Sequence, residues 1–189
     1  MRSVVARWVS IVAHPFVTTL VLAGAVTSRD GAPAALRTTA VVGLLFVLPL
    51  GVLTARQVRR GAWSTVDASQ PRERPLLFAV GGAGLLALLA WFARTQPGTA
   101  LTIGTAGVLV MLGVCAAVTP WVKVSLHLAA AALAATVLLG RGFLLGWVLA
   151  GVLPVLGWSR VALGRHRWRE VALGLVIGAV TGAVVTRLG

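Results

Sequence analysis

Residues 174–185 read GLVIGAVTGAVV, a run that contains no charged side chain. A soluble domain needs polar residues to cover its surface, whereas lipid accepts an apolar exterior without penalty. The small residues Gly and Ala recur through the run, and they let neighbouring helices approach closely in a bilayer. The stretch therefore predicts a closely packed membrane-spanning helix.

The rest of the chain has the same character. Of its 189 residues, 58% are hydrophobic and 11% are charged, and the mean hydropathy is +0.95. Ordinary soluble domains are far less apolar and carry more charge, so we expect an integral protein of the cell membrane. The only cysteine, Cys115, lies in an apolar segment, which excludes a disulfide framework and a cysteine-based zinc site.

Seven apolar segments are long enough, or nearly so, to cross a hydrocarbon layer of about 30 Å as helices. They cover residues 8–26, 38–55, 76–93, 100–118, 124–139, 143–158 and 171–186. We predict an all-α polytopic bundle of about six or seven transmembrane helices, in a single domain over residues 1–189. Only GRG (140–142) separates the fifth segment from the sixth, as either a tight turn or a kink in one long element.

If all seven segments cross the membrane, the loops at residues 56–75, 119–123 and 158–170 emerge on one side. That side carries twelve of the 17 Lys and Arg residues, and the positive-inside rule makes it cytoplasmic. The net charge is +13. Because the arginines sit between hydrophobic segments, they fit topology signals and phosphate contacts, and we expect no nucleic-acid partner.

The third of these loops concentrates the scarce ionisable groups of the chain in SRVALGRHRWREVALG (159–174). His166 and Glu170 are four residues apart, which makes them neighbours on one face of a helix. A carboxylate there can hold one imidazole nitrogen and raise the basicity of the other. Arg160 and Ser159 can donate to oxyanions, so the stretch has the parts for phosphoryl transfer to histidine. The alternative is a cluster of arginines that only sets topology.

The second loop ends in KVSLH (123–127), at the mouth of the fifth segment. Lys123 and His127 are four residues apart, with Ser125 between them. A histidine near a helix end can be a structural residue, but this one is accompanied by a cation and a hydroxyl. We take all three as candidate site residues.

Two further polar positions are weaker signals. The first loop closes on Arg74 and Pro75, where the proline begins the third segment. His14 and Pro15 lie inside the first apolar run, where an ionisable residue is a candidate for function. Since Pro15 frees a backbone carbonyl, we favour a structural role for His14.

The stretch 159–174 resembles the last motif of the type 2 phosphatidic acid phosphatase family, integral-membrane relatives of the vanadium haloperoxidases. That motif is Ser-Arg, five residues, His, three residues and Asp. The matching residues are Ser159, Arg160, Gly164, His166, Val171 and Gly174. Glu170 stands for the Asp, which keeps the carboxylate and lengthens its reach by one methylene.

The other two family motifs are matched in part. KVSLH resembles the Pro-Ser-Gly-His element, with Val124 and Leu126 in place of Pro and Gly. The family's first motif, Lys, six residues and Arg-Pro, is matched only at its last two positions. Asp67 occupies the Lys position, which is a charge reversal, and we infer that Lys123 supplies the missing ammonium group.

The resemblance implies a role for each matched residue. His166 is the nucleophile that forms a phosphohistidine, Glu170 orients it, and His127 is the general acid that protonates the leaving alcohol. The phosphate ligands are Arg160, Ser125 and Arg74. The family scheme uses no metal and no other cofactor. The expected function is a membrane-embedded phosphatase that hydrolyses a polyprenyl or glycerolipid phosphate or diphosphate.

Other functions remain open. The departures at Asp67, Val124 and Leu126 favour a catalytically silent relative that binds or transports lipid phosphates. A solute transporter fits the composition but does not explain His127 and His166 in loops on one side. Membrane prenyltransferases need paired Asp-rich motifs, which the four acidic residues of the chain cannot form.

Overall fold

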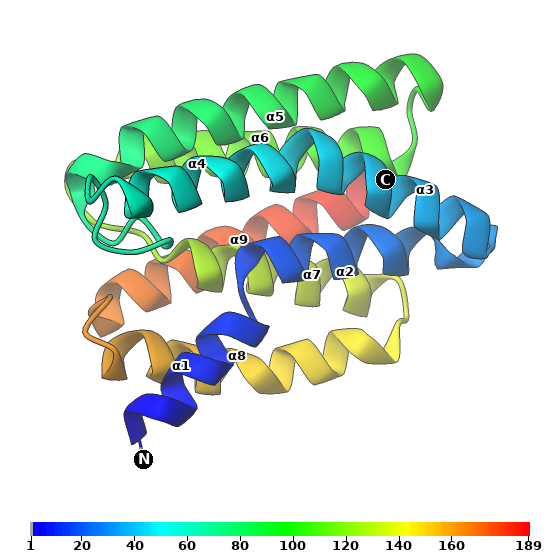
Figure 1. Cartoon of the computed structure of the whole chain (residues 1–189). Coiled ribbons are helices and arrows are strands. Elements are labelled where there is room, and N and C mark those ends of the chain that lie inside the picture. The colour runs from blue at the N-terminus through cyan, green and yellow to red at the C-terminus, as the bar shows by residue number, and fades with distance from the viewer. Residues whose placement is uncertain (1) are drawn as a thin grey trace.

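The structure is a computed structural model, and it describes residues 2–189, with side chains from residue 4 onward. Every regular element in these residues is helical, as predicted for an all-α bundle (Figure 1). The elements are α1 (Arg2–Val12), α2 (Pro15–Thr27), η1 (Ser28–Asp30), α3 (Ala32–Val42), η2 (Gly43–Val47), α4 (Leu48–Arg59), η3 (Pro71–Glu73), α5 (Arg74–Thr95), α6 (Ala100–Val118), α7 (Leu126–Gly140), α8 (Leu144–Ala162) and α9 (Trp168–Leu188).

Six segments are long and apolar enough to cross a membrane. They are Val4–Asp30, Ala32–Arg59, Pro71–Thr95, Ala100–Val118, Leu144–Ala162 and Trp168–Leu188. These spans confirm the predicted polytopic membrane bundle. The remaining segment, α7, has only 15 residues, and ten of them are buried. Helix α7 is therefore enclosed by protein along most of its length. At about 22 Å it is also shorter than the hydrocarbon thickness of about 30 Å.

The first predicted segment, 8–26, is not one continuous helix. Ala13 and His14 interrupt it, and His14 takes an extended conformation with φ −64° and ψ 141°. The cause is Pro15, which lacks a backbone N–H and disfavours a helical residue before it. As a result, α1 turns away from α2 and packs against α8 (Figure 1).

Helix α7 packs closely against α9 through glycines. A Cβ on Gly174 would collide with the backbone oxygen of Ser125, and one on Gly178 would collide with that of Ala129. Small residues at such positions allow the close backbone approach that stabilises helix pairs in lipid. The glycines that the sequence pointed to therefore hold α7, the most buried helix, directly against the C-terminal helix.

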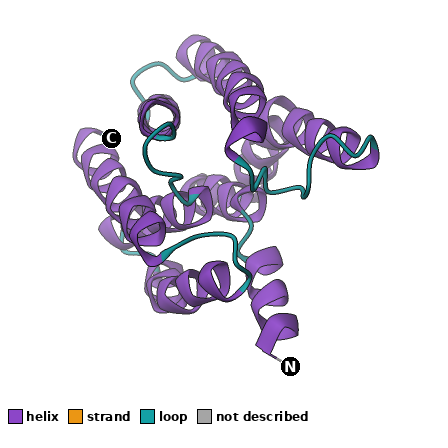
Figure 2. Cartoon of the chain, turned by 90° about the vertical axis from the view of Figure 1, so that its left-hand side faces the viewer, coloured by secondary structure: helices purple, strands orange, loops and turns teal. Residues whose placement is uncertain are grey.

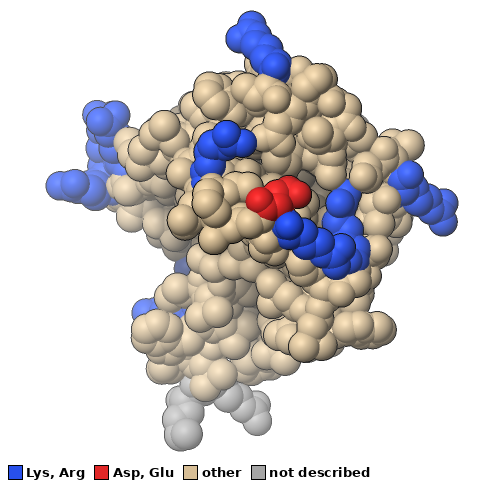
Figure 3. All heavy atoms as spheres, turned by 90° about the vertical axis from the view of Figure 1, so that its right-hand side faces the viewer, with Lys and Arg blue, Asp and Glu red and all other residues tan. Residues whose placement is uncertain are grey.

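The junction at residues 140–142 is a tight turn between antiparallel helices. Gly142 has a φ of 73°, in the left-handed region that favours glycine. Arg29 closes this end, because its guanidinium donates to the backbone oxygen of Arg141 at 2.7 Å and lies 4.4 Å from the ring centre of Phe143. Figure 3 faces this end of the bundle and shows Lys and Arg side chains at its edges and also near its centre, beside an acidic side chain.

The three loops that the sequence assigned to one side do lie together at the other end. Figure 2 looks at the bundle from that end, where the loops cross between the helix ends. Arg165, before α9, donates to the hydroxyl oxygens of Thr65 at 3.2 Å and Ser69 at 2.8 Å. Lys123, before α7, donates to the backbone oxygens of Ser69 at 3.2 Å and Arg165 at 2.6 Å. These hydrogen bonds tie the three loops to one another.

Candidate active site

His166 and Glu170 form the contact that their spacing predicted. His166 lies in the turn after α8, where its backbone N–H donates to the oxygen of Arg160 at 3.2 Å. Glu170 is in the first turn of α9, and its Oε2 lies 2.7 Å from Nδ1 of His166. An ionised carboxylate only accepts hydrogen bonds, so Nδ1 carries the proton and Nε2 keeps its lone pair. The helix begins two residues after His166, so a turn rather than a helical face sets the contact.

The surroundings of His166 favour the neutral ring. Burial and the nearby positive charges of Arg160, Arg74 and Lys123 lower its pKa to about 3. A hydrogen bond with the backbone of Lys123 opposes this effect only in part. At neutral pH the ring is thus uncharged, and its Nε2 lone pair is available as a nucleophile.

Arg160 is almost completely buried, with 1% of its surface exposed. Its Nη1 donates to Oδ2 of Asp67 at 2.8 Å and also to the hydroxyl of Ser10. The predicted phosphate ligand is therefore held by a carboxylate from the first loop and by the N-terminal helix. The sequence suggested neither partner, because they are 93 and 150 residues away in the chain.

Asp67 also meets two histidines. Its Oδ1 lies 3.5 Å from Nε2 of His14 and 3.9 Å from Nε2 of His127. Burial alone would raise the pKa of Asp67, but the hydrogen bond with His14 and the charges of His127 and Arg160 hold it well below its usual range. The carboxylate is therefore ionised at neutral pH. Asp67, which stands where the resembled motif has Lys, is thus the centre of a polar cluster.

His14 is consequently more than a structural residue of its own helix. Its Nδ1 caps α2 by accepting from the backbone N–H of Phe16 at 3.3 Å, as a structural role requires. Its Nε2 is left to face Asp67, and its ring lies 5.0 Å from that of His127. The one sequence signal for this position was an ionisable residue inside an apolar run.

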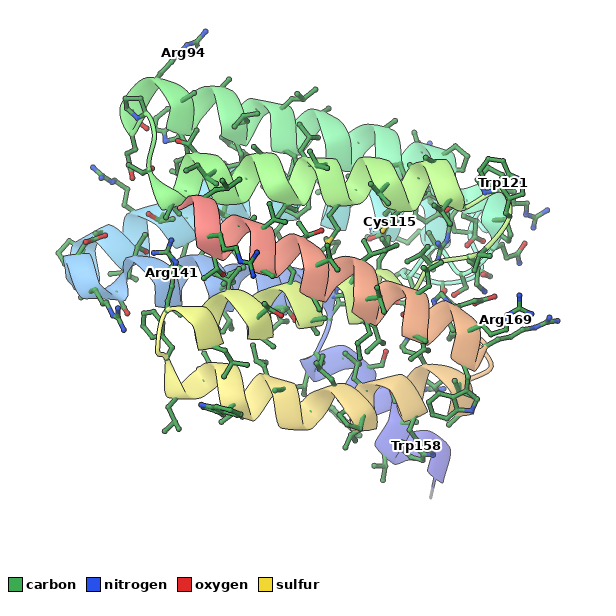
Figure 4. All side chains as sticks on the ribbon, turned by 180° about the vertical axis from the view of Figure 1, so that it is seen from behind. Arg94, Cys115, Trp121, Arg141, Trp158 and Arg169 are labelled. Carbon is green, nitrogen blue, oxygen red and sulfur yellow. The ribbon has the colours of Figure 1, made fainter. Side chains whose placement is uncertain are left out.

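Four predicted site residues have buried polar atoms without a partner. Among the described residues, five buried side-chain nitrogen or oxygen atoms lack a hydrogen bond: Arg74 Nε, Ser125 Oγ, His127 Nε2, Arg141 Nε and Arg160 Nε. Arg141 lies at the opposite end of the bundle from Trp121 and Arg169, which mark the loop end in Figure 4. Each unpaired buried group costs about 1–3 kcal/mol, and the other four can complete their hydrogen bonds with an oxygen-rich anion.

Three predicted ligands are held by the protein itself. Arg74 donates from Nη1 to the backbone oxygen of Val124 at 2.8 Å, which fixes the segment before α7 and leaves Nε unpaired. Lys123 precedes α7 and so does not share a helical face with His127. Its Nζ lies 4.0 Å from Oε2 of Glu170, and burial is the largest cause that lowers its pKa. The hydroxyl of Ser159 donates within its own helix to Leu156 at 2.9 Å, which turns it away from the anion site.

His14, Asp67 and His127 are also close enough to be considered as metal ligands. Their donor atoms all lie within 4.8 Å of one another. A metal-bound histidine normally donates a hydrogen bond from its other ring nitrogen. The other nitrogen of His14 instead accepts one from Phe16, so in the neutral ring its Nε2 carries the proton and faces Oδ1 of Asp67 at 3.5 Å. This arrangement favours a hydrogen-bonded cluster over a metal centre.

A cavity of about 730 Å³, including its open part, extends from this cluster into the bundle. His14, Asp67 and His127 form its polar end. Its other walls are mainly apolar and include Phe16, Leu85 and Met111, from α2, α5 and α6. A binding site of this kind, with convergent polar groups at one end, suits a ligand with a charged head and an apolar tail.

Comparisons with known proteins do not identify a relative. No protein-family model matches the chain, and neither the curated proteins nor the solved structures contain a match.

Proposed function

We propose that the chain is a membrane-embedded lipid phosphate phosphatase and a divergent member of the type 2 phosphatidic acid phosphatase family. The observation that carries this proposal is the set of unpaired buried donors on Arg74, Ser125, His127 and Arg160. All four residues were candidates from the sequence, and burial of unpaired donors is costly unless a ligand completes them. The substrate is a polyprenyl or glycerolipid phosphate or diphosphate.

The chemistry follows from the two histidines. Nε2 of His166 attacks phosphorus, and the bond from phosphorus to the ester oxygen breaks. His127 gives its proton to that oxygen, which leaves as the alcohol. Glu170 stabilises the phosphorylated imidazole through Nδ1. A water then attacks the phosphohistidine and gives a proton to His127, which releases inorganic phosphate and restores both rings.

The guanidinium groups supply the electrostatic part. Phosphoryl transfer develops charge on the phosphate oxygens, and positioned donors stabilise that charge without reorganising. The apolar cavity beside the cluster gives the substrate's tail a place within the bundle. From the charge count of the loops, we place this site at the cytoplasmic face.

The test is phosphate release from detergent-purified protein in a chelating buffer, with polyprenyl phosphate and phosphatidic acid in mixed micelles. His166→Ala should abolish turnover. His127→Ala should lower it strongly, because the alcohols that leave from these substrates need a proton. Arg94→Gln is the matched control, because Arg94 lies at the opposite end of the bundle (Figure 4) and should keep wild-type activity. Turnover that survives in His166→Ala would disprove the phosphohistidine route.

A second function deserves the same assay. Asp67 holds Arg160 at 2.8 Å, where a phosphate would otherwise bind, and this contact favours a silent relative that binds or transports lipid phosphates. Such a protein would bind phosphatidic acid in the same micelles and release no phosphate in any variant. Binding and turnover measured together separate the two functions.

A further inference from the structure

Asp67 has no task in the mechanism above, yet several contacts fix its position. His14 and Arg160 hold one carboxylate oxygen each. The next residue, Ala68, is fully buried and has a φ of 47°, a left-handed conformation that is unfavourable for any residue except glycine. Strain of this kind persists where the surrounding structure demands a particular geometry. The loop is therefore shaped to place this carboxylate.

The group that lacks support is His127. As general acid it must carry a proton on Nε2, which is buried and has no hydrogen-bond partner. The charged and titratable groups that act on it are Arg160, His14, His166 and Asp67. Burial and the neighbouring arginine favour the neutral ring, which cannot protonate a leaving group, and Asp67 is the only anion among these groups and opposes both effects.

We propose that Asp67 is the positioning residue that favours the protonated form of His127, so that the site contains two carboxylate–histidine pairs with opposite tasks. This inference rests on the proposed function. Glu170 orients a neutral His166 for attack, and Asp67 favours the charged form of His127 for proton donation. The distance of 3.9 Å between Asp67 Oδ1 and His127 Nε2 gives electrostatic support without a hydrogen bond. The proton on Nε2 therefore remains available to the leaving oxygen.

The test uses the dependence of the rate on the leaving group. An alkyl alcohol needs a proton to leave, whereas p-nitrophenolate does not. Asp67→Asn should lower kcat on a lipid phosphate by about 100-fold or more, the usual contribution of a general acid, with a much smaller loss on p-nitrophenyl phosphate. His127→Ala should show the same contrast, and His166→Ala should lose both activities.

Two more readouts separate this role from a structural one. The alkaline limb of the kcat profile on lipid phosphate should move to lower pH in Asp67→Asn, because the imidazolium loses its anion. Asp67→Glu, which keeps the charge, should restore the wild-type ratio of the two activities. This ratio decides the matter even where a variant folds poorly, since a loss of folded protein lowers both rates equally.

Several results would overturn the inference. Equal losses on both substrates would assign Asp67 to phosphate binding or folding. A lower KM with unchanged kcat would make it a competitor of the phosphate for Arg160. Zinc that copurifies with the wild type and is lost in Asp67→Asn would replace the pair by a metal centre. A wild type inactive on both substrates would refute the phosphatase proposal itself, and this inference with it.

Discussion

Glu170→Gln is the sharpest test of the nucleophile. The substitution keeps the size of the side chain and removes the charge that faces Nδ1 of His166 at 2.7 Å. A hydrogen bond to a charged group contributes about 1.5–3 kcal/mol, and attack on phosphorus places a positive charge on this ring. Because a barrier change of about 1.4 kcal/mol alters a rate tenfold, kcat should fall by about 10- to 150-fold.

The assay is single-turnover release of the alcohol with saturating enzyme, which isolates the attack on phosphorus. KM should change little, because Glu170 does not belong to the unpaired donor set. Glu170→Asp restores the family residue and the charge, and its loss should be smaller than that of Glu170→Gln. Asp30→Asn is the matched control, since Asp30 is an exposed carboxylate in η1 at the other end of the bundle.

A kcat for Glu170→Gln within twofold of the wild type, in a protein that His166→Ala inactivates, would refute this reasoning. The carboxylate would then only cap α9, where Oε2 also accepts from the backbone N–H of Arg167 at 3.3 Å. Thermal melting would distinguish the two roles. If Glu170 only caps the helix, its substitution lowers stability by about 1 kcal/mol and leaves the rate of attack unchanged.

Three further predictions concern stability. Gly178→Ala should destabilise the protein by about 1–3 kcal/mol in thermal melts, because its Cβ meets the backbone of Ala129; Gly113→Ala, with open space around it, is the control and should match the wild type. The pKa of His166 falls from 6.5 to about 3 on folding, so the unfolded chain binds the proton first on acidification. Stability should therefore fall by about 1.4 kcal/mol per pH unit between pH 6.5 and about pH 3, with a shallower slope in His166→Asn, and an equal slope would contradict this. Arg165→Gln should release the loop between α4 and α5, seen as faster cleavage there in limited proteolysis; an unchanged rate would show that its bonds to that loop contribute little.

Several features of the site could be predicted because they depend on local spacing. The contact between His166 and Glu170 follows from four residues of separation, and a turn followed by a helix start satisfies it as well as a continuous helix does. The meeting of the three loops follows from counting apolar segments, since each crossing reverses the side of the membrane. Neither prediction needed a side-chain conformation.

The cluster around Asp67 could not be predicted, because it depends on the path of an irregular loop. Pro15 breaks the first helix and turns His14 toward this loop, and the left-handed residue Ala68 directs the carboxylate inward. Both effects are local backbone conformations that bring together residues far apart in the chain. The sequence also predicted Ser159 as a phosphate donor beside Arg160. A hydroxyl inside a helix can instead donate to a backbone oxygen of the preceding turn, and the hydroxyl of Ser159 does so.

Under the proposed mechanism, the glycines of α9 have a consequence for catalysis as well as for packing. Their contacts fix how far α9 can slide along α7, and the two helices carry the two halves of the reaction: His127 starts α7 and Glu170 starts α9. A slip of one residue would move Glu170 about 1.5 Å relative to His127, whereas catalytic groups must be held within about 0.5 Å. Under the proposed mechanism, the contacts of Gly178 and Gly182 with α7 would therefore set the distance between acid and nucleophile from several helical turns away.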